Sequence, residues 1–122
     1  MATKTFSLHC DAAVKGIVTA ALREYAHAAY PEGGSECAQV ARYTLLQAAD
    51  TVEAGIRNEA GEVRLSRRLR TQLKAALEYY FDRHDKQTAS ASVQQRIRFT
   101  ELLKGSPLYA SDLDAARLAD QS

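Results

Sequence analysis

The densest group of charged side chains in this chain is a run of cations between residues 64 and 74. Five of these eleven residues are basic: Arg64, Arg67, Arg68, Arg70 and Lys74. Arginine guanidinium groups donate paired hydrogen bonds to phosphates and to carboxylates alike. The run therefore predicts a contact face for an anionic group. The residue types do not decide whether that group belongs to a nucleic acid or to an acidic protein surface.

The same cations stand at the end of a predicted helix where the helix dipole disfavours positive charge. The segment from Val63 to Lys86 has the pattern of one amphipathic helix, with acids gathered near its close. Each misplaced charge near a helix terminus costs about 0.3–1 kcal/mol at low salt. Either acids elsewhere in the folded chain neutralise the cluster, or the mismatch is left for a partner. The acids considered for such compensation are Glu24, Asp50, Glu53, Glu59 and Glu62.

Two residues outside the run are expected to extend this contact face. Phe81 falls on the same side of the helix as Arg67 and Lys74, at about 100° per residue. Lys104 follows a predicted fourth helix, and an antiparallel arrangement of the third and fourth helices places it near the cluster. The predicted partner-binding residues are Arg64, Arg67, Arg68, Arg70, Lys74 and Phe81.

Enzyme chemistry is not indicated by the sequence. The chain has neither a G-x-x-x-x-G-K-[ST] nor a G-x-G-x-x-G motif for cradling phosphates. The side chains that could bind zinc are spaced unlike any zinc-ligand pattern; they are His9, Cys10, His27, Cys37 and His84. We therefore predict a non-enzymatic protein with no catalytic residues, no metal and no cofactor.

The overall composition is that of one folded domain. The chain has 122 residues, 46% of them hydrophobic and 25% charged, which suffices to bury a core without metals or disulfides. The net charge of +1 gives no global attraction to nucleic acid or membrane, so any such attraction must be local. We expect a single domain over residues 1–122, with frayed ends at 1–3 and about 119–122.

The two cysteines and the N-terminus predict a cytoplasmic protein. Cys10 ends an apolar alternation, and Cys37 falls on the apolar stripe of a predicted helix, so both are expected to be reduced core residues. Free thiols are typical of a reducing compartment. We find no signal-peptide layout and no apolar run of about 18 residues that would suit a membrane span.

Hydrophobic periodicity predicts a mainly α fold, a compact bundle of four to five helices. Asp11, Ser35, Ser66 and Ser92 precede four of the predicted helices and are expected to cap them. These helices cover residues 12–30, about 36–57, about 67–86 and about 93–105, and a short last helix follows Pro107. Cys37, Val40 and Leu45 are among the residues expected on the buried stripe of the second helix.

A short β-ribbon is expected beside the helices. Phe6, Leu8 and Cys10 alternate with Thr5, Ser7 and His9, which indicates a strand over about 4–9. Residues 62–65 form either its partner strand or the run-in to the third helix. The strand is favoured because an isolated strand would lack hydrogen-bond partners. Gly61 is expected to supply a left-handed turn before it.

The first 57 residues, with "KTFSLHC" followed by two helical segments, resemble a ribbon-helix-helix repressor. In that family the strand pairs with its twin in a dimer and inserts polar side chains into the major groove of DNA. The resemblance implies that Thr5, Ser7 and His9 read the bases. A DNA-binding regulator is therefore the alternative to a protein-binding function.

A small, near-neutral helical domain without catalytic motifs favours a protein-binding function. We expect a regulatory, inhibitor or adaptor protein of the phage- or plasmid-like accessory kind, whose partner is another protein or a nucleoprotein complex. Apolar residues off the predicted stripes are expected to add to the contact surface; they are Tyr43, Leu46, Phe81, Phe99 and Leu102. Phe99, Leu102 and Leu103 are also candidates for the seam of a homodimer.

Overall fold

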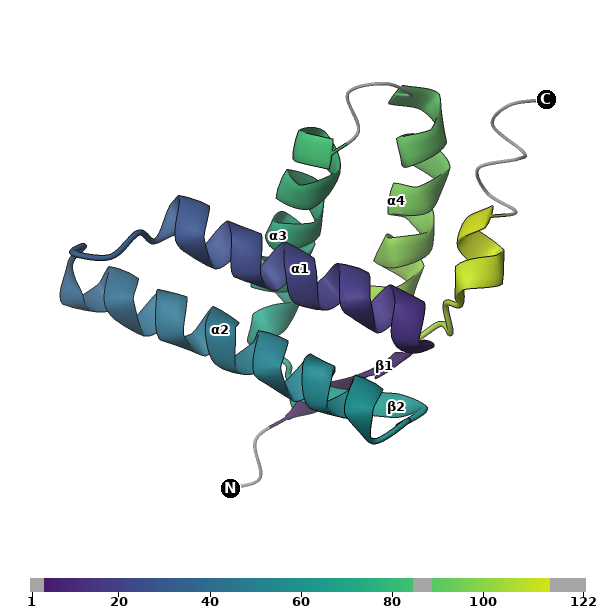
Figure 1. Cartoon of the computed structure of the whole chain (residues 1–122), viewed down its shortest axis with the longest axis horizontal. Helices are drawn as coiled ribbons and strands as arrows, with labels where there is room; N and C mark the ends of the chain where they lie inside the picture. Colours follow the sequence, from purple (N-terminus) through teal and green to yellow (C-terminus); the bar gives the residue numbers. More distant parts are fainter. Residues whose placement is uncertain (1–3, 85–88, 115–122) are drawn as a thin grey trace.

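The computed structural model describes residues 4–84 and 89–114, with the backbone alone for 89–92 (Figure 1). The fold is mainly α with a small two-stranded antiparallel sheet, as the sequence predicts. The elements in chain order are β1 (Thr5–His9), α1 (Ala12–Ala29), α2 (Glu36–Arg57), β2 (Glu62–Ser66), α3 (Leu69–His84) and α4 (Ala89–Leu103). A short helical segment at 110–114 follows. None of the described helices has the length and apolar character needed to cross a bilayer.

Two helix pairs cross one another, and the ribbon lies against them (Figure 1). α1 packs along α2, and α3 packs along α4, while α1 also contacts α3 and so joins the two pairs. The ribbon contacts α2, α3 and α4. The hydrophobic core lies where these layers meet. Its largest fully buried side chains include Leu8, Leu22, Leu45, Leu73, Phe99 and Leu102.

The ribbon is formed within the chain. β1 pairs antiparallel with β2 in a register that runs from Thr5 opposite Ser66 to His9 opposite Glu62. The alternation of side chains sends Phe6 and Leu8 into the core and leaves the polar residues on the outer face. The strand interpretation of residues 62–65 is therefore confirmed. β1 takes its antiparallel partner from its own chain, which differs from the twin-strand pairing that the ribbon-helix-helix resemblance implies.

Two of the four predicted helix caps are confirmed. The Asp11 carboxylate accepts a hydrogen bond from the backbone N–H of Val14 at 3.1 Å, and the Ser35 hydroxyl accepts one from Ala38 at 3.2 Å. The other two predictions are wrong. Ser66 is the last residue of β2, since the ladder with β1 extends to it, and α4 begins before Ser92.

The turn before β2 also differs from the prediction. The residue with positive φ there is Glu59, at 52°, and not Gly61. α2 ends at Arg57, and the backbone N–H groups of Asn58, Glu59 and Ala60 donate to carbonyls of its last turn. The chain therefore reverses immediately at the end of the helix, as in a left-handed helix termination.

The start of α2 is less buried than its periodicity predicts. Leu45, Ala48 and Val52 are buried as expected, but Cys37 is exposed and Val40 is 65% exposed. This part of α2 lies beside the end of α1, away from α3, α4 and the ribbon (Figure 1). With α1 as its neighbour, it buries less surface than the middle of the helix. The prediction that both cysteines are core residues is confirmed for Cys10 and wrong for Cys37.

One buried cation fastens the end of α2 to the start of α1. Lys15 is 2% exposed, and its ammonium donates hydrogen bonds to the carbonyl of Cys10 at 2.9 Å and to the carbonyl of Ala60. Gly55 makes room for this contact, because a Cβ there would lie 2.7 Å from Val63 Cγ2 and 3.5 Å from the Lys15 side chain. The absence of a side chain at Gly55 therefore allows α2 to approach β2 closely.

Candidate binding site at the start of α3

The predicted cationic cluster is divided among three local structures. Arg64 belongs to β2, Arg67 and Arg68 form the turn that follows, and Arg70 and Lys74 lie in α3, which begins at Leu69. The prediction of one continuous helix from Val63 is therefore wrong. Among these cations, Arg70 lies in the first turn of α3, where the helix dipole disfavours positive charge. The turn is fixed by the backbone N–H of Arg67, which donates to the carbonyl of Lys4 at 2.9 Å.

Cations from two segments far apart in the sequence line one open hollow of about 340 Å³, which we call the basic hollow. Its walls come from β1, from the start of α3 and from the turn after α4. The residues that line it are Thr5, Phe6, Ser7, His9, Arg67, Arg70, Leu103, Lys104 and Gly105. The hollow thus brings Arg67 and Arg70 of the predicted partner-binding residues beside the predicted DNA-reading residues Thr5, Ser7 and His9. It also confirms that Lys104 extends the arginine cluster.

The end of α4 is held in place by its own hydrogen bonds. The backbone N–H of Lys104 donates to the backbone carbonyl of Glu101 at 3.0 Å, and the backbone N–H of Gly105 donates to that of Leu102 at 3.0 Å. Gly105 then takes a left-handed φ of 110°, which a residue with a side chain rarely adopts. Further on, the N–H of Leu108 donates to the carbonyl of His9 at 2.8 Å. These contacts hold the turn that carries Lys104 beside β1.

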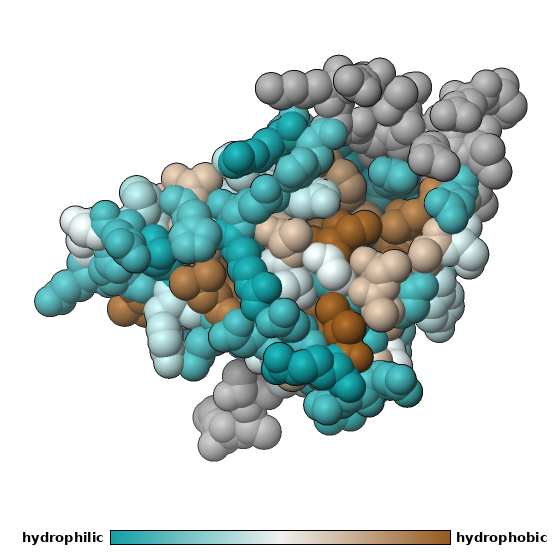
Figure 2. All heavy atoms as spheres, viewed as in Figure 1, coloured by the Kyte–Doolittle hydropathy of each residue, from teal (hydrophilic) through white to brown (hydrophobic). Residues whose placement is uncertain are grey.

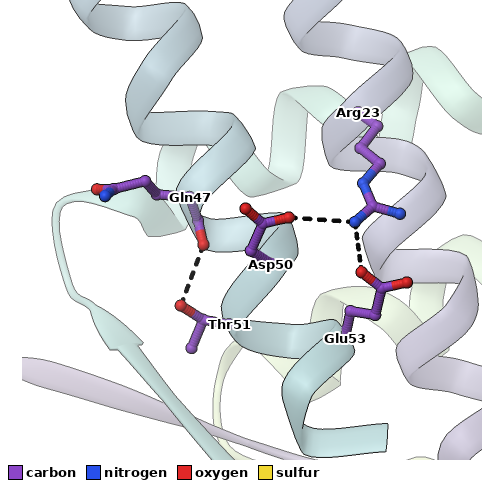
Figure 3. Close-up of polar contacts among 5 residues, drawn as sticks. All are labelled: Arg23, Gln47, Asp50, Thr51 and Glu53. Atoms are coloured by element: carbon purple, nitrogen blue, oxygen red, sulfur yellow. Dashed lines mark hydrogen bonds and ion pairs between the residues drawn. The ribbon is translucent and has the colours of Figure 1, made fainter. Parts of the chain in front are cut away.

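Most acids that were considered for neutralising the cluster are engaged elsewhere. Figure 3 shows the Arg23 guanidinium of α1 between two carboxylates of α2, at 3.2 Å from Asp50 and 2.6 Å from Glu53. The hydrogen bond from Arg23 lowers the pKa of Glu53 below its ordinary value. Glu24 contacts His84 at 2.9 Å. These acids therefore serve the packing of α1 against α2 and α3.

The remaining two acids are also occupied or distant from the hollow. Glu62 accepts a hydrogen bond from Ser7 at 2.5 Å and one from Arg64 at 3.1 Å. The Ser7 hydrogen bond and then Arg64 lower the pKa of Glu62. Glu59 lines a different depression, which contains Lys15. Arg64 is therefore partly neutralised by its neighbour on the strand.

The other cations of the cluster have no such partner among the residues that the structure describes. No carboxylate oxygen within residues 4–84 and 93–114 lies within 4.0 Å of a charged nitrogen of Arg67, Arg68, Arg70, Lys74 or Lys104. Arg67, Arg68, Lys74 and Lys104 are exposed. In the described part of the chain, the positive charge of the basic hollow is thus not compensated by close ion pairs.

Arg70 is positioned by an aromatic ring. Its Cζ lies 5.3 Å from the centroid of Phe6, a cation–π contact that joins α3 to β1. Phe6 is 6% exposed. The Nε of Arg70 is buried and has no hydrogen-bond acceptor among the described residues. Buried donors in folded proteins nearly always have a partner. The sequence could not reveal this unsatisfied donor, because the donor is buried by the packing of α3 against β1.

Phe81 does not belong to the contact face. It is 6% exposed and packs against Phe99 with ring centroids 5.2 Å apart, while the Arg96 guanidinium lies 5.7 Å from its ring centroid. The prediction that Phe81 contacts a partner is therefore wrong. α3 buries this side against α4, so Phe81 and Lys74 line the walls of a small cleft between the two helices.

The proposed homodimer seam is likewise internal. Phe99, Leu102 and Leu103 are 1%, 0% and 5% exposed, because α4 packs against both α3 and β1. Burial on two sides explains why apolar residues are spread around this helix. The large apolar side chains that are exposed are Val40, Tyr43, Val93, Ile97 and Tyr109. Figure 2 shows apolar atoms reaching the surface between hydrophilic ones on the face that it views.

Comparisons with protein-family models, with curated proteins and with solved structures return no match. The described residues contain no group of three or more His, Cys, Asp or Glu side chains that could hold a metal ion. The function is therefore inferred from the basic hollow and its surroundings.

Proposed function

We propose that this protein is a non-enzymatic binding protein of the regulatory, inhibitor or adaptor type. It docks on an acidic surface of another protein through the basic hollow and the neighbouring Arg68 and Lys74. The observation that carries this proposal is the lack of close carboxylates around Arg67, Arg70 and Lys104 in the described chain. Clustered cations repel each other, so their assembly is more favourable when a partner supplies negative charge.

The side chains around the hollow are suited to a protein contact. Arginine is enriched among residues that contribute most to protein–protein binding. Arg70 is held by Phe6, so less side-chain freedom is lost when it binds. The exposed Arg67 and Lys104 provide longer-range attraction, which raises the association rate for an acidic partner.

The direct test is affinity capture from lysate of the source cells, followed by partner identification. The test variant is Arg67→Glu/Lys104→Glu, because both side chains are exposed and their replacement leaves the core intact. The matched control is Arg57→Glu/Arg98→Glu, which makes the same charge change at exposed residues that do not line the hollow. We expect the first variant to lose partners that wild type and control retain. Equal recovery by all three proteins contradicts the proposal.

DNA binding is the second candidate, and one observation favours it. Thr5, Ser7 and His9 lie on the outer face of a two-stranded ribbon beside Arg67 and Arg70, and the major groove of DNA admits such a ribbon. Against it, the same face carries the acid Glu62 opposite His9. An acid there repels phosphates, and Ser7 already donates to it. The protein-binding reading is therefore preferred.

Selection from a random duplex library tests this alternative. A DNA-binding protein should enrich one sequence, lose affinity in the Ser7→Ala and His9→Ala variants, and weaken steeply as salt rises. Failure to enrich any sequence eliminates DNA binding as the function.

A further inference from the structure

We propose that the basic hollow binds a terminal phosphate group, carried by a phosphorylated side chain of the docked partner. This inference rests on the proposed function and narrows it from an acidic surface to one kind of anionic group. It follows from the number, placement and hydrogen-bonding state of the groups in the hollow.

The charges and donors around the hollow match those of a phosphate monoester. Arg67, Arg70 and Lys104 approach one hollow from the turn after β2, from α3 and from the turn after α4. A phosphate monoester carries a charge of about −1.5 to −2 and three acceptor oxygens near neutral pH. A carboxylate carries one charge on two oxygens. Three separate cationic donors are therefore better satisfied by a phosphate than by a single Asp or Glu side chain.

Arg70 carries an unsatisfied hydrogen-bond donor. Its Nε is buried and lacks an acceptor among the described residues, although the guanidinium is held over Phe6. A buried donor without an acceptor is costly. Arg70 lines the hollow, so a phosphate bound there can accept hydrogen bonds from its guanidinium, and Nε–H joins them once a shift of the side chain turns it toward the hollow. Arginine suits this role because several of its N–H groups can donate to one phosphate.

The size and composition of the hollow suit a phosphorylated side chain. Its volume of about 340 Å³ lies at the low end of the range for small-molecule sites, about 300–1,000 Å³. It admits a phosphorylated side chain. Thr5 adds a hydroxyl to its wall, and Gly105 adds backbone without a side chain. The acid Glu62 does not line the hollow, and its carboxylate, which accepts from the lining Ser7, is paired with Arg64 at 3.1 Å.

The test follows the side-chain Nε–H signals of arginine by NMR in the full-length, ¹⁵N-labelled chain. Inorganic phosphate is titrated against chloride at constant ionic strength, and the Arg70 signal is assigned by its loss in Arg70→Lys. We expect the Arg70 signal to shift saturably while the Arg57 and Arg98 signals stay in place. An Arg70 signal that does not respond to phosphate overturns the inference.

Variants of the exposed cations localise the site. Arg67→Gln and Lys104→Gln should each weaken phosphate binding about tenfold, the change expected from loss of one charge-assisted hydrogen bond. Arg68→Gln is the matched control, because it removes the same charge from the same turn but does not line the hollow. Equal weakening by all three variants contradicts a site in the hollow and indicates general charge attraction.

Peptide binding identifies the source of the phosphate. We compare a phosphoserine peptide with glycine flanks with its serine and glutamate versions and with free phosphate. The inference expects the phosphoserine peptide to bind about tenfold more tightly than the glutamate peptide. Binding of free phosphate that equals the phosphopeptide contradicts a phosphorylated partner side chain as the source and assigns the phosphate to a small phosphorylated molecule. Equal binding of the glutamate and phosphoserine peptides overturns the inference.

Affinity capture from a phosphatase-treated lysate separates this inference from the proposed function. If captured partners disappear after phosphatase treatment of the lysate, both stand. If capture survives the treatment and is lost in Arg67→Glu/Lys104→Glu, the protein-docking function stands and the phosphate inference fails.

Discussion

The guanidinium of Arg70 lies over the ring of Phe6, with its Cζ 5.3 Å from the ring centroid. The contact connects the first turn of α3 to the inward face of β1. It keeps a cation at the wall of the basic hollow without a carboxylate partner in the described chain. Packing, rather than ion pairing, therefore positions this charge.

The Phe6 and Arg70 side chains are predicted to be energetically coupled. Phe6→Leu should lower the free energy of unfolding by about 1–2 kcal/mol, because it loses an aromatic contact and some buried volume. A double-mutant cycle with Arg70→Gln, measured by urea unfolding, should give a coupling energy of about 0.5–1 kcal/mol. Additive effects of the two substitutions contradict a role for the ring in positioning Arg70.

The two helix glycines should respond oppositely to alanine. Gly55→Ala places a Cβ 2.7 Å from Val63 Cγ2, and such overpacking costs about 1–3 kcal/mol. Gly16→Ala is the matched control in α1, since its Cβ meets nothing within 4 Å, and should stabilise the protein by about 0.5–1 kcal/mol. Thermal unfolding distinguishes the two. If Gly55→Ala is as stable as Gly16→Ala, the close approach of α2 to β2 is not as described.

The buried Lys15 should be required for stability despite its charge. Lys15→Met keeps much of the side-chain shape but removes the donors to the Cys10 and Ala60 carbonyls. Leaving buried acceptors without partners costs about 1–3 kcal/mol. Lys74→Met, at an exposed residue of α3, should change stability by less than about 0.5 kcal/mol. Chemical denaturation of both variants checks this, and equal stabilities would contradict it.

The two cysteines should differ in reactivity. Cys37 is exposed, so a thiol reagent should modify it in the native protein. Burial raises the pKa of the Cys10 thiol from 9.0 to about 11, which keeps it protonated and protected. Counting reactive thiols below pH 9.0 should give one in the native state and two after unfolding. Two thiols that react at similar rates in the native protein disagree with this burial.

The same pKa shift makes stability depend on pH in alkali. Between the unfolded pKa of 9.0 and the folded pKa of about 11, the unfolded state binds fewer protons than the native state. The stabilisation from Cys10 is therefore complete below pH 9.0 and is lost as pH rises through about 11. Cys10→Ala should reduce this alkaline loss of stability, and an unchanged pH profile would count against the burial of Cys10.

The sequence predicts the local structure best where local signals and tertiary packing agree. Asp11 and Ser35 cap their helices because cap and helix are neighbours in the chain. The start of α3 could not be placed from helical periodicity, because residues up to Ser66 complete the ladder with Thr5, far away in sequence. Long-range pairing thus overrides the local helical pattern at that boundary.

Burial was predictable only where one side of a helix is covered. The α3 and α4 helices bury Phe81 and Phe99 against each other. Helical periodicity predicted these two residues to be exposed, because it does not show which second face of a helix is covered. The basic hollow was anticipated in part, through the arginine run and the antiparallel placement of Lys104. Phe6 and the unsatisfied Arg70 Nε required the fold, because they depend on a contact between β1 and α3.

The central claim is that the cations of the basic hollow are left uncompensated for a partner. It is tested most directly by the unfolding free energy of Arg67→Gln/Lys104→Gln at low and at high salt, with Arg57→Gln/Arg98→Gln as control. We predict that the hollow variant is more stable than wild type at low salt, by about 0.2–1 kcal/mol, because repulsion between like charges is relieved. High salt screens that repulsion, so the difference should disappear there. A variant that is less stable than wild type at low salt would mean that these cations already have acidic partners within their own chain, and would contradict the claim.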